Sequence, residues 1–173
     1  MADNLFLVAG AGLLAGAMNA VAGGGSFVTL PSLIAAGVPS VNANATSTVA
    51  LVPSALASAY AYRKDFSGFE GVAFWKMAVV SVAGGVCGAL LLMFTPQQVF
   101  DALVPFLLLF GTVAFAFGRK AGEWLRERVH IGPLVLLVMQ FALGVYGGYF
   151  GGAVGIMMLA AWSLMTSASV ASM

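Results

Sequence analysis

Long apolar stretches separated by short polar segments make up most of the chain. Five of them approach the roughly 20 residues that a helix needs to cross a bilayer, and they cover residues 4–22, 43–62, 71–94, 99–118 and 131–150. Two further apolar pieces, 27–37 and 155–166, are too short to cross, because a helix rises only about 1.5 Å per residue. The apolar residues run continuously instead of alternating, which favours helices over strands. The pattern therefore predicts an all-α polytopic membrane protein that also contains half-length helices.

The composition agrees with this pattern. Hydrophobic residues make up 61% of the chain, charged residues make up 8%, and the mean hydropathy is +1.02. Soluble domains are roughly 45–50% apolar and about 25% charged, and a domain of this size has too much surface to bury the excess. The composition thus excludes a soluble domain. With a net charge of +1 and no basic tail, nucleic acid is not expected as a partner, whereas the lipid bilayer is.

Residues that could carry enzyme or metal chemistry are scarce. The chain has one cysteine, Cys87, and one histidine, His130, so it lacks the residues for a disulfide framework, a thiolate cluster or a zinc-binding histidine pair. Lys76 and Asp101 fall at the ends of predicted spans, where interface positions are expected. Ser26 has no intramembrane His or Lys to activate it as a nucleophile. We therefore expect no enzyme activity, metal or cofactor, and any substrate must be held by neutral groups.

The positive charges predict an orientation in the membrane. All seven Lys and Arg residues fall within two windows, 63–76 and 119–130, which flank a predicted helical hairpin over 77–118. A hairpin crosses the membrane twice, so both windows lie on one face, and the positive-inside rule makes that face cytoplasmic. We expect a multi-pass protein of the plasma or inner membrane, with 119–130 as a cytoplasmic linker. A signal peptide at 4–22 is disfavoured, because no Lys or Arg precedes it.

Three consecutive glycines, Gly23, Gly24 and Gly25, follow the first apolar stretch. Glycine can adopt a positive φ, so a break in the helix is expected here, and Ser26 would serve as the N-cap of the half-length helix that follows. Irregular backbone at membrane depth persists only where it is buried in protein or lines a cavity. Because N–H groups at a helix start favour negative charge, the pattern predicts an anion site.

Polar residues follow the half-length helix. Gly37 and Pro39 end it, and the run over 40–48 contains Asn44, Thr46 and Ser47 among other polar residues. Polar side chains are therefore concentrated where the helices are interrupted, as expected for a binding site.

The alternative interpretation is that the glycines only allow helices to approach closely. This is what we expect of Gly84 and Gly88 and of Gly12 and Gly16, which are spaced four residues apart. For three glycines followed by serine and a half-length helix, we prefer a site.

A second glycine-rich break supports that preference. Residues 147–155 read GGYFGGAVG, and a short apolar piece and a polar run follow. A shift of 130 residues places Gly25 on Gly155. Glycine-interrupted helices at matching places in two halves indicate a transporter site. We therefore predict a first transmembrane repeat over 1–130 and a partial second repeat over 131–173.

At this point a family resemblance emerges. The segments GGGSFVTLPSLIAAGVPSVNANATS and YGGYFGGAVGIMML resemble the sulfite exporter TauE/SafE family of membrane permeases. The resemblance implies a helical bundle of two tandem repeats with glycine-broken, re-entrant helices, the second repeat being incomplete here. It also implies these substrate-binding positions: Gly23, Gly24, Gly25, Ser26, Asn44, Thr46, Ser47, Gly151 and Gly155. Relatives are longer, so we expect a fragment or truncated form that does not transport alone.

The function expected from the resemblance is secondary transport of small sulfur-containing anions, such as sulfite or organosulfonates. The alternative is a channel-like or structural membrane subunit without active transport. The partners expected are a small anion and the lipid bilayer. The sequence is also compatible with a homo-oligomer.

Overall fold

The computed structural model describes residues 2–61, 63, 72–126, 132–151, 154, 155, 157 and 158. The elements within these residues are seven α-helices, so the described chain is all-α as predicted. They are α1 (Ala2–Ala22), α2 (Ser26–Ala35), α3 (Ser40–Ala50), α4 (Val52–Ala61), α5 (Phe74–Met93), α6 (Gln97–Arg126) and α7 (Pro133–Phe150).

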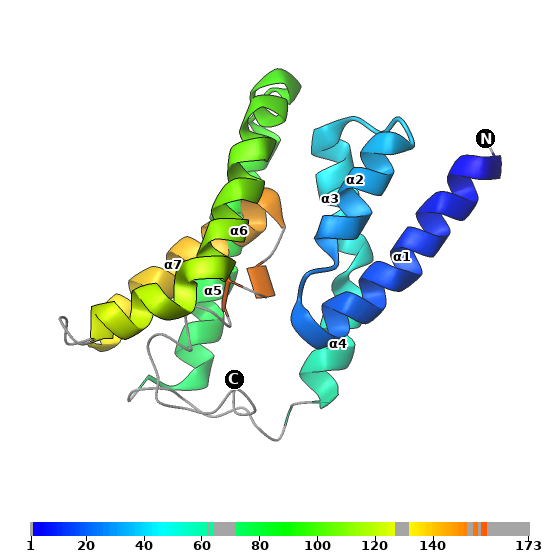
Figure 1. Ribbon diagram of the computed structural model, residues 1–173. Coiled ribbons are helices and arrows are strands. Elements are labelled where there is room, and N and C mark those ends of the chain that lie inside the picture. Colours follow the sequence, from blue (N-terminus) through cyan, green and yellow to red (C-terminus); the bar gives the residue numbers. More distant parts are fainter. Residues whose placement is uncertain are drawn as a thin grey trace.

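The helices form two groups that face each other (Figure 1). In the first group α1 packs against α2 and α4, and α2 packs against α3; in the second group α5 packs along α7. The groups meet where α3 contacts α6. The short piece of chain that contains Val154 and Gly155, orange in Figure 1, lies between them.

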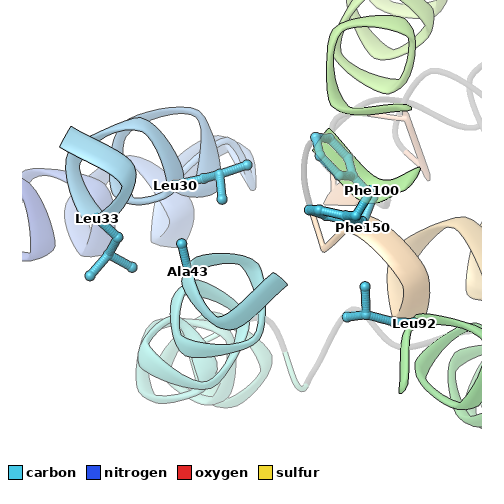
Figure 2. Close-up of a cluster of buried hydrophobic side chains, with 6 residues drawn as sticks. All are labelled: Leu30, Leu33, Ala43, Leu92, Phe100 and Phe150. Carbon is cyan, nitrogen blue, oxygen red and sulfur yellow. The ribbon is translucent and has the colours of Figure 1, made fainter. Parts of the chain in front are cut away.

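A small apolar core joins the two groups. Figure 2 shows Leu30 and Leu33 of α2 and Ala43 of α3, with Leu30 directed toward residues that come from α5, α6 and α7. The latter are Leu92, Phe100 and Phe150. Phe100 and Phe150 are 0% and 1% exposed, so their burial on the side of α2 and α3 helps to hold the two groups together.

Glycines allow α5 and α7 to pack backbone to backbone. A Cβ added to Gly84 would lie 3.1 Å from Gly144 Cα, and one added to Gly88 would lie 2.7 Å from Tyr149 N. The packing role predicted for Gly84 and Gly88 is therefore confirmed. The same prediction is wrong for Gly12 and Gly16 among the described residues, since no described atom lies within 4 Å of a Cβ built on either glycine of α1.

Not every predicted span is one continuous helix. Within the described residues, α5 and α7 are both long enough and apolar enough to cross a membrane. The stretch 43–62 is instead divided, because α3 ends at Ala50 and α4 begins at Val52. Pro53 accounts for the interruption, since it has no N–H to continue the helical hydrogen bonds. The stretch 99–118 is longer than predicted, as α6 continues through the expected linker to Arg126; residues 127–130 lie outside the described residues.

Polar side chains are buried and large apolar side chains are exposed. The buried polar residues are Ser26, Thr29, Ser40, Asn44, Ser47 and Gln140. By contrast, Phe6, Leu13 and Phe94 are 77%, 80% and 82% exposed, and many other large apolar residues are exposed as well. A water-facing surface would reverse this distribution, whereas a surface that faces lipid permits it.

Candidate functional site

The two glycine-rich breaks have the same local geometry. α1 ends at Ala22, and the following Gly23 has a φ of +73° and donates its N–H to Asn19 O at 3.0 Å. α7 ends at Phe150, and Gly151 has a φ of +68° and donates its N–H to Gly147 O at 2.7 Å. A left-handed glycine that donates back to the last turn is a common end of a helix. The positive φ expected somewhere in the triple glycine is thus found at its first member.

The breaks also touch each other. A Cβ added to Gly23 would lie 2.7 Å from Gly155 Cα, and a Cβ added to Gly155 would lie 2.8 Å from Gly23 Cα. At such distances neither residue can carry a side chain without moving the other's backbone. The 130-residue shift made Gly155 the repeat counterpart of Gly25, and this contact with Gly23 does not test that prediction.

The start of α2 is buried at the point where the breaks meet. Gly24, Gly25 and Ser26 are all buried, and their three N–H groups donate to no residue that the structure describes. Ser26 is the first residue of α2 instead of its N-cap, a position that Gly25 occupies. The helix begins one residue earlier because the Gly25 carbonyl accepts from Thr29 N at 3.1 Å, and the Ser26 hydroxyl donates to Gly151 O at 3.3 Å.

Gly25 has a packing role. A Cβ there would lie 2.8 Å from both Asn19 Cβ and Leu51 Cδ2. The packing interpretation therefore applies to Gly25, which allows the start of α2 to contact α1 and the turn after α3.

The polar run of α3 turns one face toward the breaks. Asn44 and Ser47 are 2% and 1% exposed, and Asn44 Nδ2 donates to Tyr149 O at 3.0 Å. Ser47 Oγ makes a short hydrogen bond with Thr29 Oγ1 of α2. Thr46 is exposed and is not brought together with them, because residues three or four positions apart share a helix face and Thr46 falls between them.

Two site residues were missed by the sequence analysis. Thr29 joins α2 to α3 through its bond to Ser47. Thr48 lies beside Gly151, where its Oγ1 would clash with an added Cβ, and it donates to Asn44 O at 2.9 Å. The four-residue spacing between Asn44 and Thr48 was the available signal, since it places both on one helix face.

Comparison with known proteins gives the relationship. The family model described as Sulfite exporter TauE/SafE matches residues 8–173. The chain is 33% identical over 166 residues to a probable membrane transporter protein of Haemophilus influenzae. These residues make up 94% of this chain and 64% of the relative. It is 33% identical over 153 residues to the probable membrane transporter protein YfcA of Escherichia coli. These residues make up 87% of this chain and 55% of the relative.

A third relative, the probable membrane transporter protein ORF9 of Sinorhizobium, is 32% identical over 148 residues, which cover 84% of this chain and 55% of the relative. The chain thus spans between about half and two thirds of the length of these relatives. No solved structure matches it. Because the family model covers nearly all of the sequence, the chain belongs to the sulfite exporter TauE/SafE family.

Proposed function

We propose that this membrane protein is a secondary transporter of small sulfur-containing anions, such as sulfite or organosulfonates. The family and the relatives named as membrane transporters support transport as its general role. The observation that carries the more specific proposal is the meeting of the two glycine breaks at the buried start of α2. We propose that Gly23, Gly24, Gly25 and Ser26, with Asn44, Ser47, Gly151 and Gly155, form or border the substrate site, whereas the exposed Thr46 lies outside it.

The N–H groups of Gly24, Gly25 and Ser26 are the anion's main partners in this proposal. They donate to no described residue, and the N-terminus of α2 adds roughly half a positive charge. The side-chain donors of Ser26 and Asn44 are directed instead to Gly151 O and Tyr149 O. Binding by backbone groups without a Lys or Arg suits an anion that must be released on the other side.

We also propose how the protein lies in the plasma or inner membrane. The chain crosses the membrane several times. The windows 63–76 and 119–130 lie in the cytoplasm, and the turn between α5 and α6 lies outside. Two tandem repeats with re-entrant half-length helices are favoured by the shared geometry of Gly23 and Gly151, each of which ends a long helix with a positive φ.

Transport into liposomes tests the proposed function. A full-length version of the protein, as long as its relatives, is purified and reconstituted, and the flux of radiolabelled sulfite and of an alkylsulfonate is measured against concentration. We expect saturable flux that other small sulfur anions inhibit and that a neutral sulfone does not. Unsaturated conductance would instead favour the channel-like alternative, and inhibition by the neutral sulfone equal to that by sulfonates would contradict the backbone anion site.

A further inference from the structure

The C-terminal end of α7 is capped by side chains from the other helix group. Ser26 of α2 donates to Gly151 O at 3.3 Å, and Asn44 of α3 donates to Tyr149 O at 3.0 Å. Carbonyl groups at a helix end have no partner within the helix, and lipid supplies no donor for them. The Ser26 hydroxyl hydrogen and one of the two Nδ2 hydrogens of Asn44 are therefore directed to α7, and both side chains retain oxygen lone pairs.

The side-chain oxygens of Asn44 and Thr48 both lie beside Gly151. Asn44 is 2% exposed, and its Oδ1 accepts no hydrogen bond from a residue that the structure describes. Oδ1 lies 3.8 Å from the position that a Cβ on Gly151 would occupy, and Thr48 Oγ1 lies closer to the same position. Thr48 directs its hydrogen to Asn44 O at 2.9 Å, so its lone pairs remain. Ser26 Oγ lies 3.3 Å from the carbonyl oxygen of the same Gly151.

We infer that Asn44 Oδ1, Thr48 Oγ1, Ser26 Oγ and the Gly151 carbonyl form a site for a small monovalent cation such as Na⁺. Amide, hydroxyl and carbonyl oxygens are hard ligands that suit such ions. A divalent ion is ordinarily held by carboxylates, and the described residues contain no group of three or more acidic, His or Cys residues that could hold a metal. The C-terminus of α7 adds roughly half a negative charge next to the oxygens.

The site borders the proposed anion site. Ser26 belongs to both sites. Its backbone N–H is one of the three N–H groups at the start of α2, and its hydroxyl donates a hydrogen bond to Gly151 O. The positive end of α2 and the negative end of α7 therefore meet at one residue, so an anion and a cation bound there attract each other. The cation's role as the ion coupled to anion transport rests on the proposed function, whereas its binding rests on the oxygen geometry alone.

Thermal unfolding in detergent measures cation binding without transport. The midpoint of unfolding is followed as NaCl replaces choline chloride at constant pH and ionic strength. An ion that binds only the folded state raises the midpoint in a saturable manner, so we expect a rise of several degrees with Na⁺. Equal midpoints in NaCl and choline chloride would overturn the inference.

Variants of Thr48 locate the site. Thr48→Val removes Oγ1 at nearly constant volume and should abolish the Na⁺-dependent rise, whereas Thr48→Ser should retain it. Thr112→Val on α6 is the matched control, because Thr112 is also exposed and donates in the same way to Leu108 O, at 2.8 Å. A Thr48→Val protein with the full rise would overturn the site.

Ser26→Ala provides a second variant in case Thr48→Val does not fold, and it should raise the Na⁺ concentration at half effect about tenfold or more. A Ser26→Ala protein with an unchanged half-effect concentration would remove Ser26 Oγ from the site. Anion flux is measured separately in liposomes with the full-length version. A protein with the Na⁺-dependent rise but no anion flux retains the cation site and contradicts the proposed function, and the reverse result contradicts the cation site alone.

Discussion

At the scale of single residues, two glycines decide whether the two breaks can meet. Gly23 combines a φ of +73° with a contact that would place an added Cβ 2.7 Å from Gly155 Cα. Strain at a positive φ costs on the order of 1–3 kcal/mol for other residues, and here a backbone clash adds to it.

We therefore expect Gly23→Ala to lower the free energy of unfolding by at least about 2 kcal/mol. The control is Gly12→Ala, because Gly12 lies within α1 with no described atom within 4 Å of an added Cβ; this change should be neutral or stabilise by about 0.5–1 kcal/mol. Thermal unfolding of both variants in detergent checks the difference, and equal midpoints would contradict the close approach of the breaks.

Asn44 is the second residue whose role can be tested singly. Its Nδ2 donates to Tyr149 O, so Asn44→Leu leaves a partly buried carbonyl at the end of α7 without this donor. We expect a loss of about 1–3 kcal/mol in stability. Asn42→Leu is the matched change on an exposed position of α3 and should cost little. The comparison is made by thermal unfolding, and a harmless Asn44→Leu would show that α7 is not capped from α3.

At the scale of elements, the close packing of α5 against α7 depends on the glycines on one face of α5 only. An added Cβ on Gly88 would lie 2.7 Å from Tyr149 N, whereas one on the neighbouring-turn residue Gly85 meets nothing within 4 Å. We expect Gly88→Ala to destabilise the protein by about 2 kcal/mol or more and Gly85→Ala to have no such effect. Unfolding midpoints distinguish the two, and an equal loss would mean that the helices do not cross at Gly88.

A polar link ties the start of α3 to α6. Asp101 accepts a short hydrogen bond from Ser40 Oγ, and Gln97 Nε2 donates to Ser40 Oγ at 2.7 Å and to Asp101 Oδ1 at 3.2 Å. Gln97 Oε1 also accepts from Val41 N at 3.3 Å. The negative charge of Asp101 therefore lies near the N-terminus of α3, where it is favourable.

A double-mutant cycle tests this link. Ser40→Ala and Asp101→Ala should show a coupling energy of roughly 1 kcal/mol, because each removes the other's partner. The pair Ser40→Ala and Gln98→Ala serves as the control, since Gln98 is exposed on α6 next to Gln97. Strictly additive effects for Ser40 and Asp101 would mean that the two residues do not stabilise each other.

At the scale of the whole molecule, the orientation in the membrane is the testable claim. Single cysteines at position 67, which lies outside the described residues, and at Gln98 at the start of α6 are placed in a Cys87→Ala background. We expect position 67 to react only with reagent on the cytoplasmic side and position 98 only on the outer side. Labelling of both from one side would contradict the predicted topology.

The sequence predicted the long helices more closely than the broken ones. Apolar length alone placed α5 and α7 to within a few residues, since 71–94 and 131–150 correspond to Phe74–Met93 and Pro133–Phe150. It failed at 43–62, because hydropathy averages over a proline that interrupts the backbone hydrogen bonds.

The site was predicted only in part. Glycine clusters marked where the chain breaks, but which glycine takes a positive φ, and which backbone it faces, depends on contacts between distant segments. Thr48 belongs to the polar run over 40–48, but its contact with Gly151 joins segments far apart in the sequence and was therefore missed.

The contact between Gly23 and Gly155 has a consequence for how related sequences can vary. Most neighbouring residues in a fold can exchange volume, so that a larger side chain on one is compensated by a smaller one on the other. Here both partners already have the smallest possible side chain, and each faces the other's backbone. No substitution at either position can be compensated at the other, so this contact should leave no covariation signal, although it holds together the two breaks of the chain.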